Sequence, residues 1–180
     1  VPEEHFFPWS PDSPFLYDLT VGTTQGEEEQ RDTVHSYFAL RKWSCAPDAH
    51  GIMRFCLNGK PILLNGLLDQ GYWPEGLYTP PSDGAVVREL QTIKELGFNL
   101  LRKHAKIEPQ RWYYHCDKLG MIVWQDMPSG DRGPQWQMHN YFTGEEKHRS
   151  AESEANFRKE WKEIIDYLYS VSYTHLRAHE

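Results

Sequence analysis

The sequence predicts a mixed fold, in which part of an antiparallel β-sandwich precedes a parallel sheet covered by helices. Residues 15–21 and 33–41 are strand-length runs of aromatic and β-branched residues, and no helical periodicity separates them. After residue 65, short apolar runs alternate with segments of helical periodicity. Uninterrupted apolar strands that alternate with helices are typical of a parallel sheet.

Residues 1–44 are expected to form the C-terminal part of the sandwich. Their two strands are joined by the polar segment 26–32, which is too charged for a core. A complete sandwich needs about seven strands, so two strands predict only a part of one. Residues 44–51 carry a proline, a glycine and several polar side chains, which predicts a connection between domains.

A β-hairpin is predicted at the start of the second domain, residues 45–169. The runs 52–57 and 61–64 flank Asn58 and Gly59. Asn-Gly is a strong signal for a two-residue type I′ turn, because both turn residues need positive φ.

Two helices are predicted between the strands of the parallel sheet. Ser82 and Asp83 are candidate N-caps of the first helix, and Gly97 ends it. Pro109 begins the second helix, which ends before Gly120. Their apolar residues recur at helical spacing, as Val86, Leu90 and Ile93 in the first and Trp112, Cys116 and Leu119 in the second.

Polar side chains follow the three predicted parallel strands, 66–69, 98–102 and 121–126. The candidate site residues are Asp69 after the first strand, Arg102 and His104 after the second, and Asp126 after the third. Ligands of parallel-sheet folds bind outside the carboxyl ends of the strands, so we expect these four side chains to converge there. Trp73, together with Tyr72, is a candidate for stacking on a sugar, and packing within the loop is the alternative.

A further helix is predicted by the apolar stripe of Phe157, Trp161, Ile164, Ile165 and Leu168. A loop of about twenty residues, rich in Gly, Pro, Trp and His, separates it from the third strand.

Composition excludes several classes of protein. The formal net charge is −7, so we expect no nucleic-acid partner. No apolar stretch approaches the roughly 18–20 residues of a membrane helix, so we expect no membrane partner. The three cysteines, Cys45, Cys56 and Cys116, are too far apart for a zinc site and are expected to be buried apolar residues. We expect no metal and no cofactor.

Several motifs together resemble glycoside hydrolase family 2, which includes β-galactosidases, β-glucuronidases and β-mannosidases. The motifs extend in order from about residue 8 to residue 169: Pro14-Phe15-Leu16-Tyr17, Tyr37-Phe38-Ala39-Leu40-Arg41, Leu57-Asn58-Gly59-Lys60-Pro61, Gly97-Phe98-Asn99, Cys116-Asp117-Lys118-Leu119-Gly120 and Val123-Trp124-Gln125-Asp126. The resemblance implies an immunoglobulin-like domain followed by the first third of a (β/α)8 TIM barrel.

The resemblance also implies a retaining exo-β-glycosidase that cleaves terminal β-linked sugars, with a β-glycoside or oligosaccharide as its partner. The family's acid/base Glu follows the fourth barrel strand and its nucleophile follows the seventh, so the chain is expected to contain neither catalytic residue and to be inactive alone. Arg102 matches an arginine of the family that braces catalytic carboxylates, and a homo-oligomeric parent is compatible with the family.

The resemblance names a β-galactoside as the first candidate substrate, although two departures bear on that choice. Galactosidases have Arg-Thr-Ser-His-Tyr-Pro where this chain has Arg102-Lys103-His104-Ala105-Lys106. Asp126 follows a Trp-Gln pair that is similar to the mannosidase branch.

Residues 170–180 depart from the family pattern. They resemble translated sequencing-adapter sequence, which predicts a non-native tail, and a divergent natural tail is the alternative. We therefore do not interpret His175 and His179 as metal ligands.

Two other functions remain open. The aromatic content and the polar strand ends also fit a non-catalytic carbohydrate-binding module. A metal-dependent hydrolase would use His104, Asp126 and Asp69, but the histidines show no H-x-H or HExxH arrangement.

Overall fold

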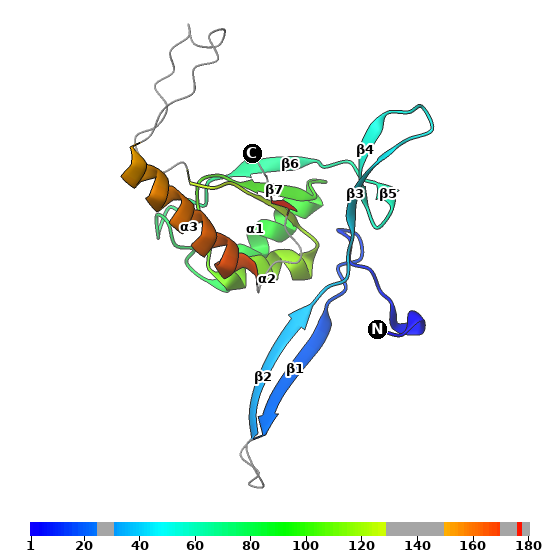
Figure 1. Ribbon diagram of the computed structural model, residues 1–180, viewed down its shortest axis with the longest axis horizontal. Coiled ribbons are helices and arrows are strands. Elements are labelled where there is room, and N and C mark those ends of the chain that lie inside the picture. Colours follow the sequence, from blue (N-terminus) through cyan, green and yellow to red (C-terminus); the bar gives the residue numbers. More distant parts are fainter. Residues whose placement is uncertain (25–30, 129–149, 170–175, 178–180) are drawn as a thin grey trace, which may run out of the picture.

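The structure, a computed structural model, describes residues 1–24, 31–128, 150–169 and 176–177 (Figure 1). Within these ranges the strands form separate sheets of two, three and four strands. The α-helices there are α1 (Asp83–Glu95), α2 (Gln110–Leu119) and α3 (Ala151–Tyr169), and a 3-10 turn spans Glu3–His5. The predicted mixture of sheets and helices is therefore confirmed. None of the described helices is long and apolar enough to span a lipid bilayer.

The first sheet is the antiparallel pair predicted near the N-terminus. Strands β1 (Tyr17–Thr24) and β2 (Arg31–Phe38) form a ribbon that extends away from the helices in Figure 1. Tyr17 lies opposite Phe38, and their rings stack with centroids 4.9 Å apart. Such aromatic pairs stabilise the ladder beyond its backbone hydrogen bonds.

The second sheet contains the predicted hairpin and a strand that the sequence analysis missed. Asn58 and Gly59 connect β4 (Met53–Leu57) to β5 (Lys60–Pro61) with φ of 53° and 77°, as a type I′ turn requires. The predicted connection over residues 44–51 is partly wrong, because Trp43–Pro47 form β3 and pair with β4. Pairing with the next strand of the chain overrides the local signal of a proline and polar residues.

The third sheet is parallel, in the order β6-β7-β8-β9. Its first three strands are β6 (Gly66–Asp69), β7 (Leu100–Lys103) and β8 (Ile122–Gln125), each where a strand is predicted. After β6 and β7 the chain crosses over through α1 and α2 respectively.

Local signals set the ends of the two crossover helices. Ser82 caps α1, since its Oγ accepts a hydrogen bond from Ala85 N at 3.1 Å. Gly120 ends α2 with φ of 75°, a left-handed conformation that glycine adopts without strain. Pro109 lies at the N-cap of α2, one position before the predicted one.

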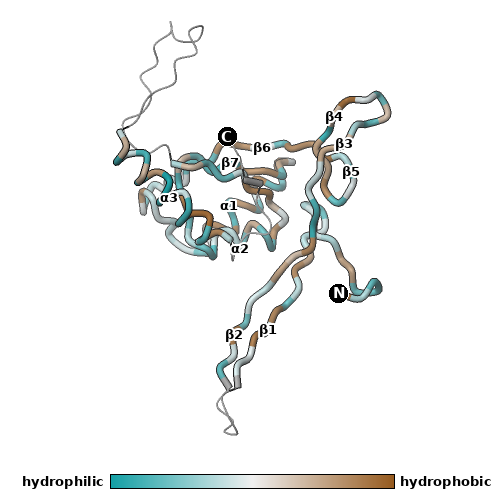
Figure 2. The backbone as a smooth tube through the Cα atoms, viewed as in Figure 1, coloured by the Kyte–Doolittle hydropathy of each residue, from teal (hydrophilic) through white to brown (hydrophobic). Residues whose placement is uncertain are grey.

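The last strand, β9 (Leu176–Arg177), follows α3 and pairs with β8. The remainder of segment 170–180 lies outside the described residues, so its non-native origin stays a prediction. The predicted Gly-, Pro- and Trp-rich loop likewise falls mostly on residues 129–149, outside the described ranges. Along α3, teal and brown segments alternate in Figure 2, as expected for a helix with one apolar stripe.

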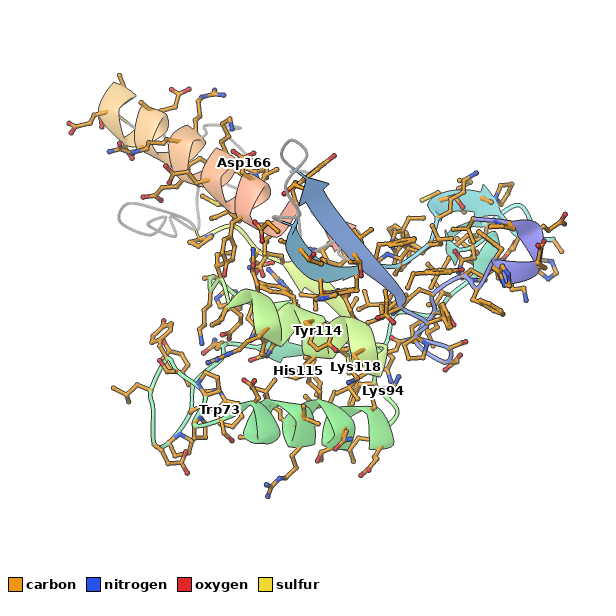
Figure 3. All side chains as sticks on the ribbon, turned by 90° about the horizontal axis from the view of Figure 1, so that it is seen from below. Trp73, Lys94, Tyr114, His115, Lys118 and Asp166 are labelled. Carbon is orange, nitrogen blue, oxygen red and sulfur yellow. The ribbon has the colours of Figure 1, made fainter. Side chains whose placement is uncertain are left out.

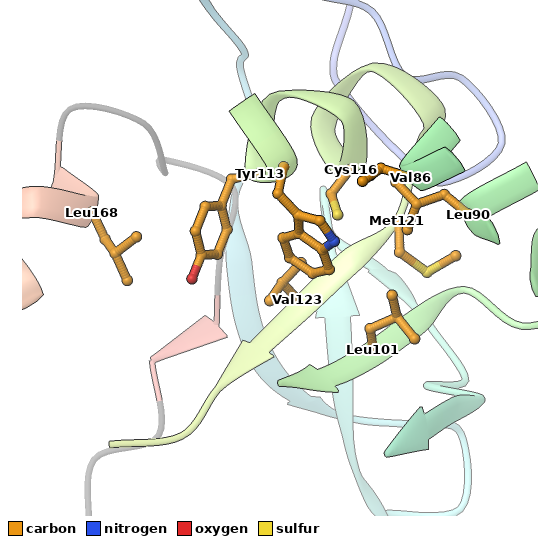
Figure 4. Close-up of a cluster of buried hydrophobic side chains, with 9 residues drawn as sticks. Val86, Leu90, Leu101, Tyr113, Cys116, Met121, Val123 and Leu168 are labelled. Atoms are coloured by element: carbon orange, nitrogen blue, oxygen red, sulfur yellow. The ribbon is translucent and has the colours of Figure 1, made fainter. Parts of the chain in front are cut away.

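Two apolar clusters cover opposite faces of the parallel sheet. Leu101 and Val123 lie on the face toward α1 and α2, in one cluster with Leu90 (Figure 4). Trp112 of α2 belongs to the same cluster. On the other face, the buried residues are Trp9, Ala39, Leu57, Leu100 and Ile122. Neighbouring residues of a strand face opposite sides, so Leu100 and Leu101 of β7, and Ile122 and Val123 of β8, are buried on opposite faces of the sheet.

The cysteines differ from expectation at one position. Cys56 and Cys116 are buried, whereas Cys45 is exposed on β3. Cys45 lies opposite Phe55, whose side chain is also exposed, so this face of the three-stranded sheet is in contact with water.

Candidate functional site

Arg102, His104 and Asp126 meet at the carboxyl end of the parallel sheet. The Nε of Arg102 donates to both carboxylate oxygens of Asp126 at 3.1 Å, and a terminal nitrogen of Arg102 lies 3.0 Å from Oδ2. His104 Nδ1 lies 3.1 Å from the same Oδ2. We call these three residues the Arg102 cluster.

Backbone pairing brings the Arg102 cluster together. Parallel pairing of β7 with β8 continues past the strand ends, because Asp126 N donates to Lys103 O at 3.0 Å. This bond sets the Asp126 carboxylate beside Arg102. The side chains of Arg102 and His104 are 56% and 46% exposed, so both are in contact with solvent at this edge of the sheet.

Asp69, the fourth predicted member, does not join this cluster. It lies opposite Lys103 in the β6–β7 register, and Lys103 points to the opposite face of the sheet from Arg102. Lys103 Nζ donates to Asp69 Oδ2 at 2.6 Å, and Asp69 Oδ1 accepts from Gly71 N at 2.7 Å. Each carboxylate oxygen of Asp69 thus accepts a hydrogen bond from within the chain. The predicted contact between Asp69 and a sugar stays a prediction.

Asp69 belongs instead to a largely buried ionic network with Lys103, Lys106 and Glu108. Glu108 Oε1 accepts from Lys103 Nζ at 2.9 Å and lies 2.9 Å from Lys106 Nζ. The side chains of Lys103 and Glu108 are both 1% exposed, and Lys103 Nζ lies 4.2 Å from the Trp112 ring centroid. Two cations and two carboxylates balance each other here, as burial of charge requires.

The ionic network extends toward α1 and changes the titration of a nearby carboxyl. Burial, reinforced by the negative charge of Asp69, raises the pKa of Glu89 above its ordinary value. Glu89 and Asp69 line a cavity of about 460 Å³ beside β6.

Lys103 and Glu108 are not among the site residues predicted from the sequence. Lys103 is the last residue of β7, and Glu108 lies in the segment before Pro109, so the sequence alone is equally compatible with solvent-exposed side chains at both positions. Side chains along a strand alternate between its two faces, so Lys103 and Arg102 must point to opposite faces of the sheet. Once the covered face is known, this alternation shows which of the two is buried.

A second set of hydrogen bonds fixes the segment that carries His104. The Tyr113 hydroxyl donates to Gln125 Oε1 at 2.6 Å, and Gln125 Nε2 donates to Lys106 O at 2.8 Å. Glu108 N donates to the same Tyr113 oxygen at 3.2 Å. Burial raises the pKa of Tyr113, which stays a neutral donor. The residues after β7 are thereby tied to α2 and to the end of β8.

Trp73 is not an open stacking surface. It lies in the loop before α1 (Figure 3), is partly buried and packs against the helix-side apolar cluster. Its backbone pairs with Leu77 through two hydrogen bonds of 2.7 and 2.9 Å. This geometry favours the alternative of packing within the loop, and the stacking role of Trp73 stays a prediction.

The Arg102 cluster presents guanidinium and imidazole donors beside a carboxylate acceptor, a combination suited to ligand hydroxyl groups. A metal site of His104, Asp126 and Asp69 is disfavoured because Asp69 is turned toward Lys103. Across the described ranges, no group of three or more His, Cys, Asp or Glu residues is placed to hold a metal ion.

Curated proteins similar to this chain include an exo-β-D-glucosaminidase and a β-galactosidase. No protein-family model matches the chain. The chain is 29% identical over 131 residues to an exo-β-D-glucosaminidase of Amycolatopsis orientalis. The aligned residues make up 73% of this chain and 12% of that protein. The chain is 27% identical over 117 residues to a β-galactosidase of Lactococcus lactis, covering 64% and 11%.

Solved structures show the same fold. A GH2 β-galacturonidase from Eisenbergiella tayi, bound to galacturonate, superposes with a TM-score of 0.69 at 20% identity and covers 97% of this chain and 27% of its own. A β-glycosidase from Bacteroides vulgatus gives 0.69 at 23% identity, covering 94% and 20%. The chain spans about one eighth of the length of the curated relatives that it matches.

Proposed function

We propose that this chain is part of a glycoside hydrolase of the family 2 type, a retaining exo-β-glycosidase that hydrolyses terminal β-linked sugars. The observation that carries the proposal is the Arg102 cluster at the carboxyl ends of β7 and β8. In barrels of parallel strands, active sites are built at this end.

The proposed architecture is the first third of a (β/α)8 barrel behind the end of an immunoglobulin-like domain. In it, β6, β7 and β8 are the first three barrel strands, and α1 and α2 are the helices between them. The parallel order and the helix that follows each of β6 and β7 support this assignment. Residues 1–44 then belong to the preceding domain, and residues 45–169 to the barrel.

The proposed mechanism uses two glutamates outside this chain. In a retaining glycosidase one carboxyl protonates the leaving oxygen, and a second about 5–5.5 Å away attacks the anomeric carbon. Arg102, whose orientation Asp126 fixes, would donate hydrogen bonds to one of these carboxylates or to a sugar hydroxyl. His104 would contribute a second donor or acceptor at the same edge.

The proposed substrate is a β-linked sugar, with a β-galactoside as the first candidate. Lys103 and Lys106, two of the residues by which this chain departs from galactosidases, are buried in the ionic network. Both lysine side chains are buried at this end of the sheet and do not reach the exposed Arg102 cluster. Of the residues that differ from galactosidases, His104 has the exposed polar side chain. It is therefore the residue expected to change which sugar hydroxyl the site binds.

Activity of the complete gene product tests the proposal. We expect release of nitrophenol from at least one of the 4-nitrophenyl β-galactoside, β-glucoside, β-mannoside, β-glucosaminide and β-glucuronide. The 180-residue chain alone is expected to release none. Turnover by the chain alone would show that the catalytic pair is misplaced. Sugar binding by the complete product without turnover of any substrate would favour a carbohydrate-binding module.

A further inference from the structure

Two tyrosines form an exposed aromatic pair in the loop between β6 and α1. Tyr72 and Tyr78 are 60% and 54% exposed. Their ring centroids lie 4.7 Å apart at an interplanar angle of 68°, and their hydroxyl oxygens are hydrogen-bonded at 2.7 Å. Trp73, between them in sequence, packs inward instead.

Lys106 contacts the loop that carries this aromatic pair from its buried side. Its ammonium group donates to Gly71 O at 2.7 Å and to Tyr78 O at 2.6 Å, and so joins two parts of the loop that are seven residues apart. The same group lies 5.1 Å from the Tyr78 ring centroid, within the range of a cation–π contact. Because Lys106 is largely buried and also paired with Glu108, it anchors the loop to the buried ionic network.

The tyrosine pair and the Arg102 cluster belong to the same edge of the sheet. Gln125 donates to the backbone oxygen of Lys106, and Asp126 follows Gln125 directly. Lys106 is therefore tied through its backbone to the strand that carries Asp126, and through its side chain to Tyr78.

We propose that Tyr72 and Tyr78 form a stacking subsite for a sugar ring of the β-linked substrate, distinct from the ring that contacts the Arg102 cluster. The inference rests on the proposed function, because it takes the substrate to be an oligosaccharide. Aromatic faces bind the C–H groups of a pyranose, and phenol hydroxyls pair with its hydroxyl groups. The mutual hydrogen bond uses one of the two hydroxyl protons, so one donor remains for the sugar.

The size and rigidity of the pair favour a sugar over a protein partner. Two rings offer a surface that matches one sugar ring, whereas a stable protein interface buries about 800 Å² on each partner. The rings are held in one arrangement before binding, so little conformational entropy is lost when a ligand is ordered on them.

Fluorine NMR of the full 180-residue chain, labelled with 3-fluorotyrosine, tests the proposal. The probes are cellobiose, lactose and N,N′-diacetylchitobiose, each added to about 20 mM because one stacking contact gives millimolar affinity. Signals are assigned by Tyr72→Phe and Tyr78→Phe. We expect the two loop signals to shift on titration with at least one disaccharide, and the signal of Tyr169, a tyrosine of similar exposure on α3, to stay unchanged.

Alanine variants provide the second measurement. Tyr72→Ala and Tyr78→Ala are each expected to weaken disaccharide binding by about 3–10-fold, whereas Tyr169→Ala leaves it unchanged. Unchanged loop signals with every probe, or equal shifts at Tyr169, would overturn the subsite. Nitrophenol release by the complete gene product is scored separately. Turnover without loop shifts contradicts only the subsite, and loop shifts without turnover contradict only the hydrolase.

Discussion

The hydroxyl of Tyr37 donates to the buried carboxylate of Asp117 at 2.9 Å and joins β2 to α2. Trp9 Nε1 donates to the backbone oxygen of Asp117 at 2.8 Å, so two N-terminal segments meet at this one residue. Arg41 lies over the rings of Trp9 and Trp43, and burial lowers its pKa to about 9. Burial and the charge of Asp117 raise the pKa of Tyr37, which therefore stays a neutral donor. These two bonds tie the N-terminal segments to α2, while Trp9 and Ala39 pack on the face of the parallel sheet opposite the helices.

Asp117→Ala is expected to lower the free energy of unfolding by about 3 kcal/mol, because it removes the acceptor of the part-buried Tyr37 hydroxyl and the negative charge that favours the protonated form of Arg41. Urea unfolding followed by tryptophan fluorescence measures the change. Glu163→Ala, at an exposed position of α3, is the control and should change stability by less than about 0.5 kcal/mol. Equal effects of the two variants would contradict the anchoring role of Asp117.

Lys103→Met is expected to lower the free energy of unfolding by about 3–5 kcal/mol. Methionine preserves much of the volume but leaves Asp69 and Glu108 as buried carboxylates that have lost one cation. Lys159→Met changes an exposed lysine of α3 and serves as the control in the same urea titration. A loss below about 1 kcal/mol would show that Lys106 alone balances the network.

Arg102→Ala is expected to separate activity from stability. Its pair with Asp126 is partly exposed, so its removal should cost no more than about 1 kcal/mol of unfolding free energy. In the complete gene product, kcat/KM for the preferred nitrophenyl glycoside should fall about 100-fold, because a positioning group is lost. Arg158→Ala, on α3, is the matched control. Unchanged kcat/KM for Arg102→Ala would remove the Arg102 cluster from the proposed site.

Glu89→Gln is expected to change how stability depends on pH. The raised pKa of Glu89 means that the folded chain binds its proton more tightly than the unfolded chain does. Its contribution to stability is therefore complete below the unfolded pKa and is lost as pH rises through the folded pKa. The variant should gain stability relative to the original chain as pH rises from 4 to 7.

Melting temperatures at a series of pH values measure this difference, with the exposed Glu160→Gln as the control. A gap between Glu89→Gln and the original chain that does not widen with pH would contradict the prediction.

Several elements of the fold are predictable because their signals are local. Asn58-Gly59 specify a turn through their own backbone preferences, and Ser82 and Gly120 mark helix ends in the same way. Strand β3 was missed because its stability comes from pairing with β4 rather than from its own composition. Asp69 was grouped with Arg102 because a sequence shows that a strand ends in a charge but not which neighbour the charge meets.

The sequence by itself determined the hairpin, the alternation of strands and helices from β6 to α3, and the edge of the sheet where polar side chains gather, since periodicity and capping act over a few residues. Only the tertiary structure decided that Arg102 and Lys103, adjacent in sequence, serve opposite faces, one open and one buried. It also turned Trp73 inward and left Tyr72 and Tyr78 exposed. These outcomes depend on strand register and on what covers each face, which are set by contacts between residues far apart in the chain.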